Sequence, residues 1–311
     1  MNLYFHPGMP KSATLQDLLD DHPVLVLDGA MGTEIDRRGG DVSLPLWSSR
    51  ALETAPQMVR SIHQDYVSAG ARIITANTFR TTTYTYQRAG FAEAAARLKA
   101  ARATGTAVQL ALEAAHGRAL VAGSLAPLGD CYTPEDYPGP DNARHNYTEQ
   151  ANRLAQAGVD LFLLETHITL EEALAALMAA TATGLPVWVS FLVDDRCQLP
   201  GGHSLQDAVQ AVENGGAAAI LVNCVTLPVA AKAAEFLPKA TRLPAGIYAN
   251  AGHSQPSPAG ALTATYSDNE YLAAAISWVN YGIRIIGGCC GTTPLTTRRL
   301  ADHFHPLDPS H

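Results

Sequence analysis

The chain has 311 residues, of which 47% are hydrophobic and 16% are charged, a balance typical of a compact globular protein rather than a disordered one. Its 29 acidic residues outnumber 21 basic ones, giving a net charge of −8, and no basic cluster is visible, so we exclude nucleic acid and membrane surfaces as partners. Five cysteines, no recognisable signal peptide and no apolar run long enough to span a bilayer favour a protein of the reducing cytoplasm.

Short apolar runs alternate with helical patterns along the chain. Strands are predicted at 24–27, 72–76, 119–122, 161–164, 187–191, 218–224, 246–249 and 285–288. Helices are predicted near 56–68, 92–115, 170–181 and 205–213. About eight strand–helix units is the number that closes a (β/α)8 barrel. No linker divides them, so we predict an α/β protein with a single TIM barrel domain over residues 1–311 and a core at about 22–304.

One predicted connection is unusually long. Residues 127 to about 144, after the third strand, are rich in Pro, Gly, Asp and Tyr. Because a plain connection is shorter than this, we expect a lid or a substrate loop.

Polar residues and thiols gather at the carboxyl ends of the predicted strands, where (β/α)8 barrels place their catalytic side chains. They are Asp28, Asn77, Ser124, Glu165, Cys224, Asn250, Cys289 and Cys290. The strands themselves stay apolar, so these ends should converge on one pocket.

The most informative stretch runs from Ile285 to Pro294, where an apolar strand ends in glycines that flank Cys289 and Cys290. Glycines let a backbone turn sharply beside a ligand, and two adjacent thiols there indicate a metal site. Zinc takes four ligands, or three with one open position for catalysis. Cys224, at another strand end, is the natural third ligand, although alone it would also fit a small apolar core residue.

Five stretches, in order over nearly the whole chain, resemble the homocysteine S-methyltransferase family: Asp28–Thr33, Ala76–Phe79, Glu165–Thr166, Val222–Cys224 and Gly287–Gly291. The family includes betaine-dependent and S-methylmethionine-dependent enzymes and the homocysteine-binding module of methionine synthase. The resemblance implies a barrel in which Cys224, Cys289 and Cys290 hold Zn²⁺, with the homocysteine sulfur as an exchangeable fourth ligand. Methyl transfer to that sulfur would form methionine.

The same resemblance implies the substrate-binding residues. Asp28 and Glu165 match the acidic positions that hold the substrate's amino group. The backbone around Ala30, Met31 and Gly32, with Thr33 beside it, suits the carboxylate, and Asn77 and Asn223 are further strand-end candidates. From the residues alone, Asp28 could instead cap its turn, and Asn223 could satisfy only backbone groups.

The methyl donor should carry a positive leaving group, which aromatic faces can hold. Candidates for this role are Trp47, Tyr84, Tyr86, Tyr132 and Tyr248. Residues 43–48 are similar to a segment of S-methylmethionine-dependent members, whereas 76–79 is closer to methionine synthase. We favour S-methylmethionine as the donor over betaine or S-adenosylmethionine.

Two alternatives stay open at this point. The barrel could be a homocysteine-binding module that serves a partner methyl carrier, or a zinc hydrolase or lyase with Glu165 as general base. In every case the expected partners are small molecules, and the protein is expected to be a monomer or a small homo-oligomer. The remaining thiols and histidines of the same face are expected bystanders: Cys131, Cys197, His167, His203 and His253.

Overall fold

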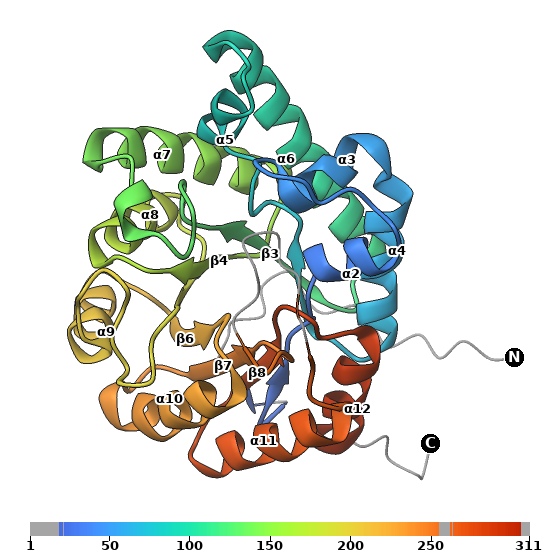
Figure 1. The fold of residues 1–311 in the computed structure, drawn as a ribbon, viewed down its shortest axis with the longest axis vertical. Coiled ribbons are helices and arrows are strands. Elements are labelled where there is room, and N and C mark those ends of the chain that lie inside the picture. Colours follow the sequence, from blue (N-terminus) through green and yellow to red (C-terminus); the bar gives the residue numbers. More distant parts are fainter. Residues whose placement is uncertain (1–18, 21, 255–261, 263, 306–311) are drawn as a thin grey trace, which may run out of the picture.

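The computed structural model describes residues 19–20, 22–254, 262 and 264–305. In these ranges eight parallel strands curl into a barrel with helices around it (Figure 1), which confirms the predicted (β/α)8 fold. The strands are β1 (Leu25–Val26), β2 (Ile73–Ala76), β3 (Leu120–Leu125), β4 (Leu161–His167), β5 (Val187–Phe191), β6 (Ala219–Asn223), β7 (Ala245–Ala249) and β8 (Ile285–Gly288).

The strands follow one another around the barrel in chain order, and the first and last meet. β1 pairs with β8, with Leu25 opposite Ile285. A single parallel bridge between Leu27 and Ile73 joins β1 to β2 and closes the circle. The carboxyl ends of all eight strands therefore point to the same face, as the prediction for the site requires.

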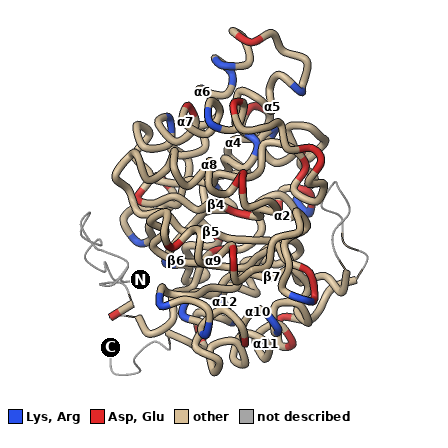
Figure 2. The backbone as a smooth tube through the Cα atoms, turned by 90° about the vertical axis from the view of Figure 1, so that its left-hand side faces the viewer, with Lys and Arg blue, Asp and Glu red and all other residues tan. Residues whose placement is uncertain are grey.

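Helices form the outer shell of the barrel. They are α2 (Gly32–Arg37), α3 (Ala51–Thr54), α4 (Pro56–Ser68), α5 (Thr83–Arg88), α6 (Glu93–Ala115), α7 (Pro140–Ala157), α8 (Leu170–Thr181), α9 (Leu205–Asn214), α10 (Leu227–Ala240), α11 (Asp268–Asn280) and α12 (Pro294–Phe304), with 3-10 turns η1 (Trp47–Arg50) and η2 (Pro134–Asp136). Figure 2 shows Lys and Arg interspersed with Asp and Glu over this shell. None of the described helices is long and apolar enough to cross a membrane.

The connection after β3 is shorter than predicted. Helix α7 already begins at Pro140, so the loop does not extend to residue 144. The reason is local, since Gly139 has a φ of 86° and Pro140 occupies the first turn, where its missing N–H costs no hydrogen bond. The sequence prediction took this proline as a loop signal.

Side-chain alternation in the strands builds two apolar layers. Leu163, Trp188 and Leu221 belong to the cluster inside the barrel, whereas the intervening residues pack in the larger cluster beneath the helices. Because the period of a strand is two, the inward register continues two residues further on to Glu165, Ser190 and Asn223. The barrel is thus apolar below and polar at its carboxyl face.

Candidate metal centre and substrate cavity

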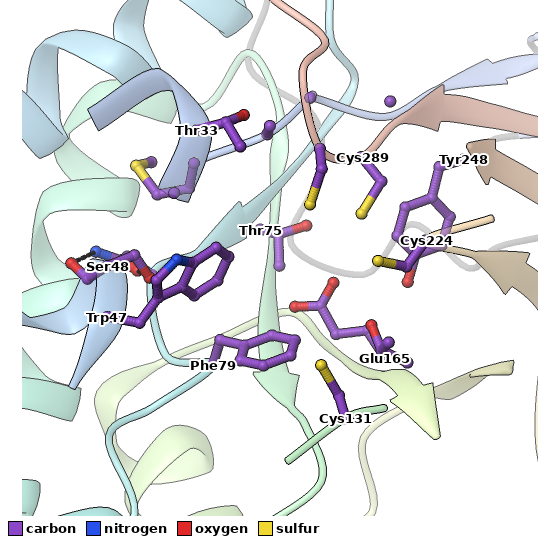
Figure 3. Close-up of a pocket in the computed structure, with 18 of the residues that line it drawn as sticks. Thr33, Trp47, Ser48, Thr75, Phe79, Cys131, Glu165, Cys224, Tyr248 and Cys289 are labelled. Atoms are coloured by element: carbon purple, nitrogen blue, oxygen red, sulfur yellow. Dashed lines mark hydrogen bonds between the residues drawn. The ribbon is translucent and has the colours of Figure 1, made fainter. Parts of the chain in front are cut away.

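Three thiols meet at the carboxyl face of the barrel (Figure 3). Cys224 directly follows β6, and Cys289 and Cys290 follow β8. Their sulfur atoms all lie within 4.8 Å of one another. In a tetrahedral site with Zn–S bonds of about 2.3 Å the sulfurs would be roughly 3.8 Å apart, so only a small adjustment separates this cluster from a zinc site.

Hydrogen bonds from neighbouring segments fix the turn that carries the vicinal cysteines. The backbone N–H of Cys290 donates to Oδ1 of Asn250 at 3.0 Å. The N–H of Gly291, which has a φ of 81°, donates to Oγ1 of Thr33 at 3.0 Å. Thr33 therefore supports the cysteine turn from the opposite end of the chain.

The end of β6 is held by the side chain of Asn223. Its Oδ1 accepts from the backbone N–H of Thr166 at 3.0 Å and from Oγ of Ser190 at 2.7 Å, and its Nδ2 donates to Oγ1 of Thr166 at 2.8 Å. Thr166 and Cys224 both have positive φ, at 63° and 55°. Asn223 does not line the cavity described below; it joins the β4 end that carries Glu165 to the β6 end that carries Cys224.

Without a cation, the thiol cluster is a poor place for negative charge. The hydrogen bond shared with Cys289, together with burial, raises the pKa of Cys224 well above its ordinary value. The hydrogen bond with Cys224 and burial do the same to the pKa of Cys290. The hydroxyl of Tyr132 lies 3.1 Å from Sγ of Cys224. A bound cation would reverse this preference, because coordination deprotonates a thiol.

Two carboxyl groups share the cavity with the thiols. Asp28 accepts from the N–H of Thr75 at 2.7 Å and from its Oγ1 at 3.2 Å, and burial, with a contribution from the charge of Glu165, raises the pKa of Asp28 to about 8. Glu165 accepts from Oγ of Ser124 at 2.5 Å, yet burial still raises its pKa to about 7. Both groups would gain by pairing with a cationic group such as an ammonium.

A cavity of about 110 Å³ joins these groups. Of the predicted site residues, the structure places these on its wall: Asp28, Ala30, Met31, Gly32, Thr33, Asn77, Glu165, Cys224, Cys289 and Cys290.

Two of these predicted residues are already engaged with other parts of the protein. The N–H of Ala30 donates to Oγ1 of Thr292 at 3.2 Å, and its carbonyl accepts from the hydroxyl of Tyr66 at 2.9 Å. Asn77 accepts from Oγ of Ser48 at 2.7 Å and donates to the Ser48 carbonyl at 2.9 Å. Ala30 thus positions its loop, and Asn77 holds η1 against the end of β2.

Comparison with known proteins decides the family. The family model described as homocysteine S-methyltransferase matches residues 25–304. The chain belongs to the homocysteine S-methyltransferase family. It is 31% identical to the homocysteine S-methyltransferase of Escherichia coli, over 92% of this chain and 97% of that protein. It is 29% identical to YbgG, a homocysteine S-methyltransferase of Bacillus subtilis, over 92% and 96%.

A solved structure extends this similarity to three dimensions. The metallated form of the homocysteine methyltransferase MmuM from Escherichia coli superposes with a TM-score of 0.81 at 28% identity, covering 93% of this chain and 99% of that one. The predicted family resemblance is therefore confirmed.

In this member of the homocysteine S-methyltransferase family, aromatic rings form part of the cavity wall. Trp47 and Phe79 face each other edge-on with ring centroids 5.5 Å apart, and Tyr132 and Tyr248 also line the space. The other two aromatic candidates do not line it: Tyr84 and Tyr86. Tyr86 lies on α5 with its side chain buried in the helical shell.

Of the cysteines and histidines expected to have no role in the site, one lines the cavity and the others do not. Cys131 lines the cavity, and burial raises the pKa of its thiol to about 11. Cys197 lies on a separate surface hollow. The three histidines lie off the cavity: His167 is buried with Nε2 3.1 Å from the Leu125 carbonyl, His203 lies 3.8 Å from Glu171, and His253 stacks on Tyr266.

Sequence reasoning did not assign a role to three residues of the cavity wall, Thr75, Phe79 and Arg80. Thr75 supports Asp28, Phe79 extends the aromatic wall, and Arg80 brings a positive charge. A signal was available for Arg80, because it directly follows the strand-end motif Asn77–Phe79 and carries a charge into a loop of the catalytic face.

Proposed function

We propose that this protein transfers a methyl group from a sulfonium donor, S-methylmethionine, to the thiol of homocysteine, and that Cys224, Cys289 and Cys290 hold Zn²⁺ for the reaction. The observation that carries the proposal is the cluster of three sulfurs on the wall of a cavity that also holds two carboxyl groups. The similarity to a relative solved in a metallated form supports the metal assignment.

The donor set suits zinc. Three thiol ligands beside an open cavity match a catalytic zinc site with one exchangeable position. Bound there, Zn²⁺ would supply the positive charge that keeps thiols deprotonated at neutral pH without redox chemistry. The three cysteine ligands together carry excess negative charge, so an incoming substrate sulfur would retain more nucleophilicity than beside neutral imidazoles.

The acceptor's amino-acid end is assigned to the segments after β1 and β4. Asp28 and Glu165 take the homocysteine ammonium, since each carboxyl is buried and has a raised pKa that a cation would lower. The carboxylate lies against the backbone of Met31 and Gly32, where the first amides of a helix have no intrahelical acceptor. Asn223 contributes by holding the β4 end in position, and Asn77 contributes by holding η1, which carries Trp47, against the end of β2.

The donor is assigned to the aromatic wall. A sulfonium can lie against the faces of Trp47 and Phe79 without meeting a competing nucleophile. A lone pair of the homocysteine sulfur forms the new bond to the methyl carbon, and the electrons of the broken bond return to the donor sulfur, leaving a neutral thioether. Because an anion and a cation become neutral products, a cavity that excludes water and aligns the two sulfurs favours the step.

The test is methionine formation by the reduced, zinc-loaded protein with homocysteine and each of three donors in parallel: S-methylmethionine, betaine and S-adenosylmethionine. We expect turnover with S-methylmethionine. Turnover only with betaine or S-adenosylmethionine would contradict the donor assignment. Stoichiometric zinc and homocysteine binding without turnover on any donor would instead favour a homocysteine-binding module for a partner methyl carrier.

A further inference from the structure

Arg80 is a positive charge on the wall of the substrate cavity. It follows Phe79 in the segment after β2, and only 9% of its surface is exposed. The other charged side chains that line this cavity within the described residues are the carboxyl groups of Asp28 and Glu165. Within the described residues, the cavity thus combines two acidic groups with one group, the guanidinium of Arg80, that carries a permanent positive charge.

Within the described residues, the guanidinium is held in place by backbone carbonyls and an aromatic ring rather than by an ion pair, although its charge also acts on Glu172 and Asp136. Its Nη1 donates to the carbonyls of Pro127 at 3.2 Å and Gly129 at 2.5 Å, and its central carbon lies 5.1 Å from the ring centroid of Phe79. Among the described residues no carboxylate forms an ion pair with it, and the bonds above use only one of its three nitrogens. Within the described residues, Nε and Nη2 form no hydrogen bond. Neither atom is fully buried either, so both can reach a ligand or solvent.

The position of Arg80 associates it with the donor rather than with homocysteine. It lies against Phe79, and Figure 3 shows Phe79 and Trp47 across the cavity from Cys289 and Tyr248. The carboxylate of homocysteine shares a carbon with its ammonium, so it has to stay near Asp28 and Glu165. Hydrogen bonds, not Arg80, oppose the burial that raises the pKa of Glu165.

Arg80 also lies where the cavity adjoins a second hollow. Together with Leu44 it lines a second hollow of about 80 Å³, which Arg88 and Asp130 also line. Arg88 is already paired with Asp136 at 2.5 Å. An anionic group that extends from the aromatic wall toward this hollow therefore meets Arg80.

We propose that Arg80 binds the carboxylate of the methyl donor and so selects donors that are amino acids with a cation at the far end. A guanidinium has fixed donors that match a carboxylate. S-methylmethionine separates its sulfonium from its carboxylate by a longer chain than betaine does, which suits a cation that lies beside the aromatic wall and next to the second hollow. This assignment rests on the proposed function, because it names the donor's place in the same site.

Donor analogues provide the test. The zinc-loaded protein is assayed with S-methylmethionine and with its carboxamide, which has nearly the same size and no negative charge. We expect the wild-type protein to prefer the carboxylate form, and Arg80→Met to raise the KM for S-methylmethionine about 10- to 100-fold while hardly changing the KM for the carboxamide. Arg80→Lys, which keeps the charge but not the fork, should recover part of the preference.

Arg88→Met is the matched control. Arg88 supports the same loop through Asp136 but does not line the main cavity, so its loss should leave the preference for the carboxylate intact. If Arg80→Met weakens the use of both donor forms equally, Arg80 only supports the loop of Pro127 and Gly129. A rise in the KM for homocysteine instead would assign Arg80 to the acceptor. Either result overturns the proposal.

Calorimetric binding separates failure of this inference from failure of the proposed function. S-methylmethionine, betaine and their carboxamides are titrated into the zinc-loaded protein in the absence of homocysteine. A carboxylate preference that Arg80→Met abolishes supports the Arg80 site even if no methyl transfer is found. Methyl transfer without any carboxylate preference would support the proposed methyltransferase function and overturn the role of Arg80.

Discussion

The two walls of the cavity are built in different ways. Cys224, Cys290 and Glu165 stand at the ends of strands and are held by side chains that link one strand end to the next. Trp47 and Arg80 come from segments beyond the strand ends, held mainly by contacts with other loops. In a barrel the strands fix geometry while the loops vary. Under the proposed function, the strand-end wall would therefore serve the acceptor chemistry and the loop wall would select the donor.

The sharpest way to break this comparison is to remove a thiol from the strand-end wall. Three variants each remove one thiol: Cys224→Ser, Cys289→Ser and Cys290→Ser. Loss of a residue that only holds a metal ligand in place lowers metal affinity by up to about 100-fold. Loss of a ligand itself should therefore lower zinc affinity and methyl transfer by more than that. Zinc content after dialysis and methionine formation are the measurements. Cys197→Ser, the same change on a separate hollow, should retain both, and full zinc and activity in all three cavity variants would rule out the thiolate site.

The pH dependence of stability distinguishes a buried group outside the cavity, His63, from the carboxyl groups on the cavity wall. His63 lies on α4, fully buried, with no hydrogen-bond partner for either ring nitrogen among the described residues, and burial lowers its pKa from 6.5 to about 4. Between pH 6.5 and pH 4, His63 is protonated in the unfolded chain but neutral in the folded chain. The contribution of His63 therefore lowers the free energy of unfolding as the pH falls through this range. Asp28 and Glu165, whose pKa values are raised, act in the opposite direction.

Comparing His63→Leu with the wild type cancels the carboxyl contribution. We expect the variant to gain about 2 kcal/mol in unfolding free energy relative to the wild type when the pH is lowered from 7 to 4.5. Urea unfolding of the zinc-free proteins measures this difference. An equal pH dependence in the two proteins would show that His63 is not kept neutral by the fold.

Glu165→Gln tests the acceptor side of the strand-end wall. The amide keeps the size of the side chain and can still accept from Ser124, but it loses the charge proposed to hold an ammonium. The KM for homocysteine should rise about 10- to 100-fold, with a smaller effect on the KM for the donor. Glu171→Gln, on α8 and next to His203 rather than the cavity, is the control; a rise in the donor KM alone would reverse the assignment of the two walls.

The smallest effect is expected from removing the contact between Tyr132, on the loop wall, and the thiol of Cys224. Tyr132→Phe removes the hydroxyl that lies 3.1 Å from Sγ of Cys224. A single hydrogen bond of this kind corresponds to a change of about 3- to 10-fold in zinc affinity or turnover. Tyr137→Phe, in the same connection but off the cavity, should have no effect, and a loss as large as that of a cysteine variant would make Tyr132 part of the metal site.

The strand-end wall was largely predictable from sequence because each of its residues ends an apolar run. Periodicity located the runs, a barrel aligns their ends, and the glycines around Cys289 and Cys290 indicated a ligand turn before any family was named. The role of Asn223 was not predictable, because whether an amide meets a substrate or the backbone of Thr166 depends on the positive φ of that neighbour.

The loop wall was predicted less well. Tyr86 was a donor candidate by its place in the chain, yet its helix directs the side chain into the shell. Arg80 was overlooked because its position depends on hydrogen bonds to the Pro127 and Gly129 carbonyls, which are distant in sequence. Likewise, Pro140 was interpreted as part of a loop although a proline starts helices as readily as it interrupts them. Such outcomes depend on contacts between distant segments, which a local pattern does not contain.

The pairing of β1 with β8 means that the catalytic face is finished only when the last strand arrives. A nascent chain that has emerged as far as β6 already carries Asp28, Glu165 and Cys224, but it lacks both the vicinal thiols and the neighbour that β1 needs. Under the proposed function, capture of zinc would thus coincide with barrel closure, and an incomplete or proteolysed chain that lacks β8 could not assemble the three-thiol site. Zinc binding would therefore indicate that the barrel is complete, in addition to being required for the proposed reaction.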